Sequence, residues 1–222
     1  MTRSEILFEQ FCSANNICCE RVEETISKTP DYLIKKNGLE VIVEVKQVDP
    51  NSQEKGLIKT FEKNGFMTRS STPGERVRKK IKDSGPQISE FAKGKCPSLL
   101  VLYNNLPPYF SDPLCSYNIR VGMYGLETIN FDVPSDPSIP CQILDCGFGP
   151  KYRMTKTSHT SISALGVLKN TPGEKLKLYL FHNSYASIPL PLGSFTSENC
   201  LEFILDTKQG REFQEWVSGA LS

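Results

Sequence analysis

A β-hairpin is predicted by the stretch Pro30-Asp31-Tyr32-Leu33-Ile34-Lys35-Lys36-Asn37-Gly38-Leu39-Glu40-Val41-Ile42-Val43-Glu44-Val45-Lys46-Gln47. Asn37-Gly38 stands between two apolar runs, and a two-residue type I′ turn needs positive φ at both central positions. With these two residues as the loop, Ile34 pairs with Val41, and Asp31 lies opposite Glu44. The second strand is apolar on both faces, which is typical of a strand in the middle of a sheet.

The predicted hairpin brings two carboxylates and a lysine together. Directly opposed residues of a strand pair share a face, with Cβ atoms roughly 5 Å apart, so Asp31 and Glu44 should repel each other. Lys46 projects from the same face because side chains alternate with a period of two. Such a cluster is costly to leave unpaired at the end of a buried strand, and a divalent cation would relieve the repulsion.

Pro30-Asp31 followed by Glu44-Val45-Lys46 resembles the signature of the PD-(D/E)xK nuclease superfamily, which has the restriction-endonuclease-like fold. The resemblance implies an α/β fold with an αβββαβ core, in which helices flank a central mixed sheet. We expect one domain over residues 1–222, with this core in 1–105 and further strands and a closing helix in 106–222. The alternative is an incidental network of charges on an edge hairpin.

The resemblance also implies the activity, a metal-dependent hydrolysis of phosphodiester bonds. Asp31, Glu44 and the backbone carbonyl of Val45 are expected to hold Mg²⁺ or Mn²⁺, hard ions that take oxygen ligands. Lys46 is expected to orient the attacking water or help to deprotonate it. Gln47 follows the lysine, as a glutamine often does in this group, and joins the expected catalytic residues.

The first helix is expected to supply another acidic residue. Residues 3–15 have the apolar periodicity of an amphipathic helix, and in many members of the superfamily this helix contributes a carboxylate to the metal site. Glu5 lies nearer the apolar stripe than Glu9, so we expect Glu5 to act in catalysis and metal binding, with Glu9 as the fallback. Thr2 and Glu5 also have the spacing of a capping box, which is the purely structural alternative for Glu5.

One segment is strongly basic. Residues 75–82 predict a helix with Val77 and Ile81 on its buried side. Its cations are Arg76, Arg78, Lys79, Lys80 and Lys82. A helix that follows the hairpin borders the substrate cleft in this superfamily, so we expect these side chains to contact nucleic-acid phosphates. A solvated helix face is the alternative. Beyond an interruption at Gly85-Pro86, Gln87 resembles a glutamine that lies near the scissile phosphate, or else simply starts a helix.

Composition limits the partners. Lys and Arg number 26 against 25 Asp and Glu, a net charge of +1, so nucleic-acid binding must come from local patches. The first residues show no apolar run of the signal-peptide type, no stretch approaches a membrane span, and the eight cysteines contain no CxxC pair, so we expect reduced thiols in a cytoplasmic protein. The expected partner is DNA rather than RNA. We expect no contact with a membrane, and the sequence is compatible with a homodimer. A catalytically idle module that binds nucleic acid or assembles is the alternative function.

The remaining elements are predicted from local pattern. Residues 17–26 suit an outer strand, 53–63 a helix and 97–104 a buried strand. Further strands are expected at 117–123, 126–131, 162–168 and 176–182, and a closing helix at 208–221. Residues 132–161 are rich in Pro, Asp, Gly and Ser and are expected to be irregular. His159 and His182 are isolated and are expected to be hydrogen-bonded structural residues.

Overall fold

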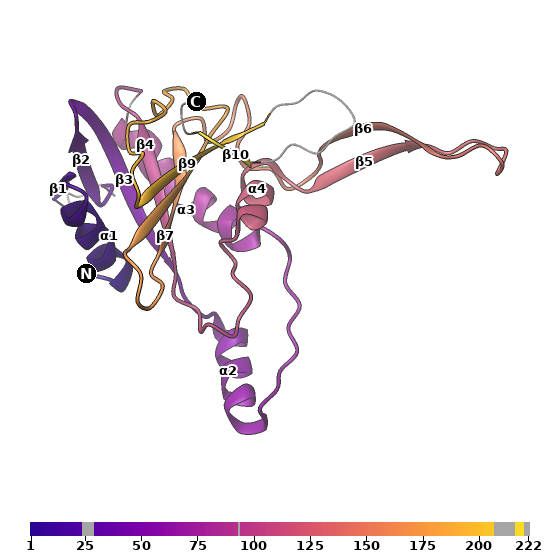
Figure 1. Cartoon of the computed structure of the whole chain (residues 1–222), viewed down its shortest axis with the longest axis horizontal. Coiled ribbons are helices and arrows are strands. Elements are labelled where there is room, and N and C mark those ends of the chain that lie inside the picture. The colour runs from indigo at the N-terminus through magenta and orange to yellow at the C-terminus, as the bar shows by residue number, and fades with distance from the viewer. Residues whose placement is uncertain (24–28, 93, 207–215, 220–222) are drawn as a thin grey trace.

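The computed structural model describes residues 1–23, 29–92, 94–206 and 216–219, and an eight-stranded sheet forms its centre (Figure 1). The strands follow one another in space as β1 (Cys18–Arg21), β2 (Tyr32–Lys36), β3 (Leu39–Val48), β4 (Ser98–Asn104), β7 (Ala164–Lys169), β8 (Lys177–His182), β9 (Cys200–Leu205) and β10 (Trp216–Ser218). The pairs β3–β4, β4–β7 and β8–β9 are parallel and the others antiparallel. The prediction of an α/β protein with a large mixed sheet is confirmed.

Helices cover both faces of this sheet (Figure 1). Helix α1 (Arg3–Ala14) packs Phe8 and Phe11 against Val43 and Val45 of β3. On the other face, α3 (Glu75–Ala92) and α4 (Ser116–Tyr124) bury apolar side chains against Leu100 and Leu102 of β4 and their neighbours. Helix α2 (Ser52–Asn64) projects away from the sheet (Figure 1). Because β4 is apolar on both sides, its position in the middle of the sheet follows from its sequence.

The hairpin has the predicted turn and register. Asn37 and Gly38 both have positive φ, 53° and 80°, as a type I′ turn requires. Lys36 pairs with Leu39, Ile34 with Val41 and Tyr32 with Val43. One step further along this register, Asp31 lies opposite Glu44.

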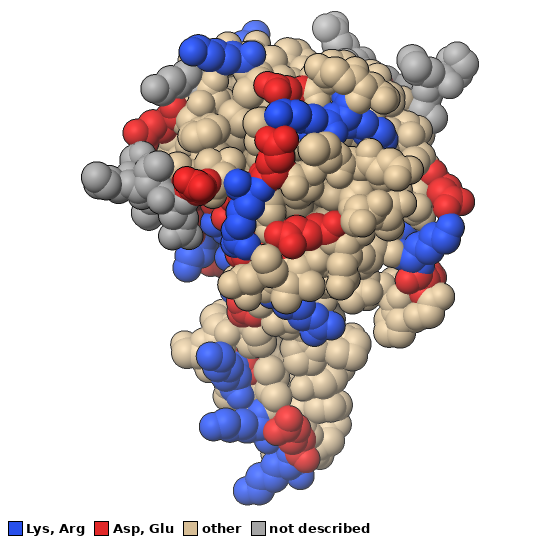
Figure 2. Space-filling view, turned by 90° about the vertical axis from the view of Figure 1, so that its left-hand side faces the viewer, with Lys and Arg blue, Asp and Glu red and all other residues tan. Residues whose placement is uncertain are grey.

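Strand β1 forms one edge of the sheet and carries alternating charges. Lys35 of β2 makes ion pairs with Glu20 of β1 and Glu40 of β3. Figure 2 shows basic and acidic side chains interspersed over this side of the molecule, with no large area of a single sign. Such charges discourage the pairing of an exposed edge with another strand.

Several local predictions hold. Helices at 3–15 and 53–63 and strands at 97–104, 126–131, 162–168 and 176–182 correspond to elements of the structure within about two residues at each end. Strand β1 occupies part of the predicted 17–26, of which residues 24–28 lie outside the described part. The expected interruption at Gly85-Pro86 is absent, since α3 continues through Pro86. Pro86 is exposed, so water can bind the carbonyl group that its missing N–H leaves free.

The strand predicted at 117–123 is wrong, because these residues belong to helix α4. Alternating Ile119, Val121 and Met123 favoured a strand, yet all three are buried on the helix. Gly122 permits the packing of this helix against α3, since a Cβ atom there would lie 2.5 Å from the Val77 side chain. The two helices therefore pack closely only where this glycine is present, and tertiary packing overrides the β propensity.

Two other predictions are corrected. The segment 132–161 is not wholly irregular, because β6 (Gln142–Phe148) pairs with β5 (Glu127–Asp132) in a separate two-stranded sheet that projects from the body (Figure 1). The closing helix at 208–221 falls largely outside the described residues, and its described part includes strand β10, paired with β9, instead of a helix. In both cases the strand pairs with the strand that precedes it in the chain, and periodicity alone does not reveal this pairing. No helix in the described part of the chain is long and apolar enough to span a membrane.

Replacing Gly38 by alanine should lower the free energy of unfolding by about 1 kcal/mol, because a Cβ atom at φ +80° is strained although nothing crowds it. Gly56→Ala is the matched control, since that glycine is helical and equally uncrowded, and alanine should stabilise the helix slightly. Urea denaturation measures both variants. Equal effects would show that the turn does not constrain the hairpin.

Candidate active site

Asp31, Glu44 and Lys46 meet at the point where β2 begins beside β3. The backbone N–H of Val45 donates to Asp31 Oδ2 at 2.7 Å, so the Asp31 carboxylate lies against the middle of β3. The Glu44 side chain is fully buried and makes an ion pair with the ammonium group of Lys46, which is 33% exposed. The structure thus brings together the three side chains that the hairpin register predicted.

Helix α3 covers the face of the sheet on which the Glu44 side chain lies. Gln87 donates from Nε2 to Glu44 Oε2 at 3.0 Å and also hydrogen-bonds the backbone carbonyl of Thr29. Lys80, two turns earlier on the helix, lies on the same side. Burial lowers the pKa of Lys80, and the nearby Lys46 ammonium lowers it further. Gln87, one of the six residues expected to act in catalysis, thus contacts Glu44 directly.

The two carboxylates make ionisation of the site unfavourable. Burial, opposed by Lys46 and reinforced by the charge of Asp31, raises the pKa of Glu44 to about 7. Burial also raises the pKa of Asp31, although the Val45 N–H and Lys46 oppose the shift. Near neutral pH this pair therefore binds a proton readily, which a cation at the same place would displace.

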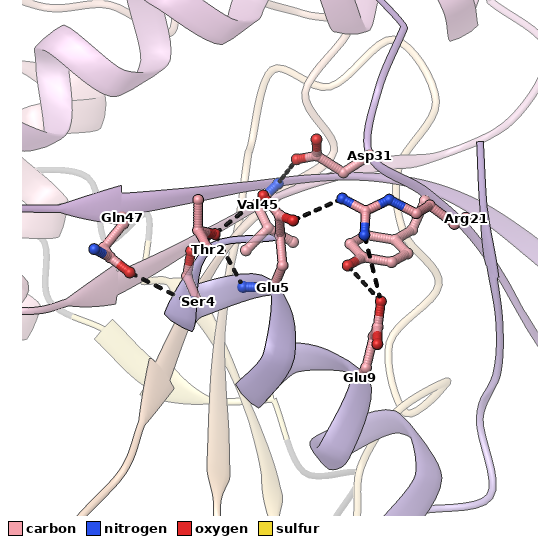
Figure 3. A network of polar contacts seen from close by, with 9 residues as sticks. Thr2, Ser4, Glu5, Glu9, Arg21, Asp31, Val45 and Gln47 are labelled. Carbon is pink, nitrogen blue, oxygen red and sulfur yellow. Dashed lines mark hydrogen bonds and ion pairs between the residues drawn. The ribbon is translucent and has the colours of Figure 1, made fainter. Parts of the chain in front are cut away.

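Glu5 reaches the same region from α1, but a different partner holds it (Figure 3). Arg21 of β1 donates to Glu5 Oε2 at 2.6 Å, and the Thr2 hydroxyl donates to Oε1 at 3.0 Å. Burial opposes ionisation most strongly, yet these hydrogen bonds together hold the pKa of Glu5 below its usual value. The Thr2 hydroxyl also accepts from the Glu5 N–H, so the residue is part of the helix cap as well.

Glu9 and Gln47 are turned to other contacts. Glu9 accepts from the Tyr32 hydroxyl at 2.8 Å and lies 4.0 Å from Arg21. Gln47 accepts from the Ser4 N–H at 3.2 Å (Figure 3). It also donates to Asp49 at 2.6 Å. Gln47 follows Lys46 and so projects from the opposite face of β3, where it fastens the strand to the start of α1. The structure gives it a structural contact and places it apart from Glu44.

The cations of α3 have different surroundings. Arg76 makes an ion pair with Glu54 of α2, whose buried carboxylate is also held by Arg69 at 2.5 Å. Arg78 is only 6% exposed, whereas Lys79 and Lys82 are exposed. The five cations therefore lie on different sides of α3, and their contact with nucleic-acid phosphates stays a prediction.

The two histidines have structural partners. His182 Nε2 lies 3.0 Å from Glu202 Oε2, and the buried Glu202 also accepts from the Phe195 N–H and the Thr196 hydroxyl. His159 Nδ1 lies 2.9 Å from the Arg153 carbonyl oxygen, so this nitrogen carries the proton and donates it. Both observations agree with the predicted structural role.

Arg21 is the site neighbour that sequence reasoning missed. It lies in β1 opposite Tyr32, and its contact with Glu5 joins β1, α1 and the start of β2. The alternation of charges in residues 17–26 indicated a strand, but no tight turn fixes how that strand pairs with β2. The sequence therefore lacks a signal that would place Arg21 beside Glu5.

The donor atoms at this site suit a hard cation. Within the described residues there is no group of three or more His, Cys, Asp and Glu side chains that could hold a metal ion. Two carboxylates are present, and the buried Glu44 Oε1 has no hydrogen bond in the described part, although the Lys46 ammonium group pairs with it. An oxygen-rich site of two carboxylates, a backbone carbonyl and water fits Mg²⁺ or Mn²⁺.

Comparison with known proteins adds no relative. No protein-family model, curated protein or solved structure matches this chain.

Glu44→Gln should stabilise the metal-free protein more at pH 8 than at pH 5. The pKa of Glu44 is raised from 4.5 to about 7, so the folded state binds the extra proton and stability falls as pH rises through this window. Glutamine avoids that fall, and the difference from wild type should grow by roughly 2–3 kcal/mol between the two pH values. Urea denaturation in EDTA measures it, with the exposed Glu40→Gln as control. A difference independent of pH would contradict the assignment.

Arg76→Ala should destabilise the protein by about 2 kcal/mol, because it leaves the buried Glu54 carboxylate with one partner fewer. Lys79→Ala removes a charge from the same helix at an exposed position and should change stability by less than about 0.5 kcal/mol. Thermal or urea unfolding compares the two variants. Equal destabilisation would mean that the ion pair with Glu54 does not stabilise the fold.

Proposed function

We propose that this chain is a metal-dependent nuclease that hydrolyses phosphodiester bonds, with DNA as its substrate ahead of RNA. The observation that carries the proposal is the fully buried Glu44, with its raised pKa, beside Asp31 and Lys46. A buried carboxylate of this kind is costly to the fold and clusters at functional sites. We further propose that the elements from α1 to β4 form a restriction-endonuclease-like core. Their order along the chain and the parallel pairing of β3 with β4 support this.

The proposed metal ligands are the carboxylates of Asp31 and Glu44 and the backbone carbonyl of Val45. Glu44 Oε1 is paired only with the Lys46 ammonium group, and the Asp31 carboxylate is fixed through its Oδ2 atom by the Val45 N–H. When bound, Mg²⁺ or Mn²⁺ would polarise the phosphate and lower the pKa of a water molecule. Glu5 is proposed as a ligand only after release from Arg21, and its present contacts favour a role in holding α1 against the site.

Lys46 is proposed to act on the attacking water and on the charge that develops at phosphorus. Its side chain is partly exposed, so its ammonium group is accessible from solvent while still paired with Glu44. Gln87 positions the Glu44 carboxylate through its amide hydrogen bond. Lys80 lies near Lys46 and supplies a second positive charge, which favours the binding of an anionic substrate at this edge of α3.

Lys46→Ala should reduce DNA cleavage by about a hundredfold or more while leaving Mn²⁺ binding intact, because an ammonium group does not ligate the cation. Asp31→Ala should abolish both. Labelled single-stranded, duplex, branched and RNA substrates are incubated with Mg²⁺, Mn²⁺ or EDTA, and calorimetry measures Mn²⁺ binding. Lys35→Ala is the matched control, since Lys35 is a partly exposed lysine of the same hairpin.

Two outcomes would contradict this proposal. Cleavage by Lys46→Ala at the wild-type rate would remove the role assigned to the lysine. A wild-type protein that retards DNA in a gel and never cuts it with either metal would instead be the catalytically idle binding module.

A further inference from the structure

A second basic surface lies on the edge of α3 turned away from Glu44. Residues 151–153, which follow the projecting β5–β6 sheet, run beside the first half of α3 and form an open groove with it. The groove, called the α3–151 groove below, is lined by Thr72, Glu75, Arg78, Lys79, Lys82, Asp83, Lys151 and Arg153. Five of these residues are cations and two are carboxylates. Lys151 and Arg153 come from beyond residue 105, where the sequence pattern indicated no nucleic-acid contact.

The positive charge of this groove is not neutralised by ion pairs. None of its five cations makes an ion pair within the described residues, whereas Arg76 on the same helix is paired with Glu54. Arg78 is only 6% exposed, and its Nη1 has no hydrogen-bond partner in the described part. Arg153 Nε lacks a partner in the same way. Burial lowers the pKa of Arg78, and the charge of Arg153 acts in the same direction against that of Glu75. Such a cluster costs stability unless an anion completes it.

The far wall of the groove is held in place by several contacts. The N–H groups of Arg153 and Met154 both donate to the Met123 carbonyl, at 3.0 and 2.8 Å. His159 packs against α3 at Gly85, where a Cβ atom would lie 2.6 Å from the ring. Lys151 has a φ of 69°, in the left-handed region that a lysine rarely adopts. The backbone at Arg153 is thus fixed beside α3, and Lys151 and Arg153 both line the groove.

The groove and the candidate active site lie on opposite edges of α3. Lys80 and Gln87 are seven residues apart on the edge beside Glu44, and Arg78 and Lys82 are four apart on the other edge. A helix with its side chains is about 10–12 Å across, close to the width of the DNA major groove, about 12 Å. The crest between the two edges carries Glu90 together with Lys79 and Asp83, which also line the groove. These three exposed side chains have a net negative charge, so the two edges favour phosphates more than the crest does.

We infer that the α3–151 groove binds phosphates of the DNA strand that is not cut, so that a duplex lies across α3 with one backbone on each edge. This inference rests on the proposed function, because it distinguishes the uncut strand from the strand at Glu44 and Lys46. In the view of Figure 2, basic and acidic side chains are interspersed. Arg21 is ion-paired with Glu5 and Lys35 with Glu20, whereas the groove cations make no ion pair within the described residues.

The test compares duplex and single-stranded DNA with the double variant Lys82→Ala/Lys151→Ala. Both lysines are exposed, so the fold should tolerate the change. Binding of a labelled duplex and of one of its strands is measured in EDTA at several salt concentrations. For the duplex, the slope of log affinity against log salt should fall by about two, one for each phosphate that the variant no longer binds. For the single strand, the slope should be unchanged.

Lys175→Ala/Lys177→Ala is the matched control, because it removes the same charge at two ion-paired lysines near the β7–β8 turn, of which Lys175 is exposed and Lys177 partly exposed. It should leave both slopes as in wild type. An equal decrease on duplex and single strand, or a decrease no larger than that of the control, would overturn the inference while leaving the cleavage result untouched. A duplex-specific decrease in a protein that never cleaves would support the groove and remove the proposed function. A wild-type protein that neither binds nor cuts DNA would overturn both.

Discussion

The register of the β2–β3 hairpin is the constraint on which the candidate site depends. A two-residue turn leaves one way to pair the strands, and a shift by one residue would move every side chain of β3 to the other face. With the observed pairing, Asp31 meets the Val45 N–H and lies opposite Glu44. The apolar alternation of Val41, Val43 and Val45 fixes which face α1 covers. The carboxylate of Glu44 consequently lies on the α3 face, beneath Gln87.

The candidate site destabilises the fold that holds it. Glu44 is fully buried and faces a second carboxylate, so its charged form is disfavoured, and Lys46 and Gln87 compensate only in part. Two other buried carboxylates, those of Glu54 and Glu202, have more ion-pair and hydrogen-bond partners. Glu54 has two arginines, and Glu202 has a histidine, a hydroxyl group and backbone N–H donors. The contrast supports a functional role for Glu44, because structural carboxylates in the same protein are well compensated.

Helix α3 connects the two halves of the molecule. One face packs Val77 and Ile81 into the core, one edge carries Lys80 and Gln87 toward Glu44, and the other edge meets residues 151–159. Gly85 allows His159 to approach, and Gly122 allows α4 to pack against Val77. The later part of the chain therefore reaches the same helix that borders the candidate site. This arrangement allows one substrate to contact both edges of α3.

The sequence by itself determined the hairpin, its register and the meeting of Asp31, Glu44 and Lys46, because a tight turn and a period of two act over short distances. It also determined the buried strand at 97–104, from an apolar run too long and continuous for a surface strand. Only the tertiary structure decided that Glu5 pairs with Arg21, that Arg76 pairs with Glu54, and that residues 117–123 are helical. It alone placed Lys151 and Arg153 beside α3. Each of these outcomes depends on a partner distant in the chain, and local propensity carries no information about which distant surface will be there.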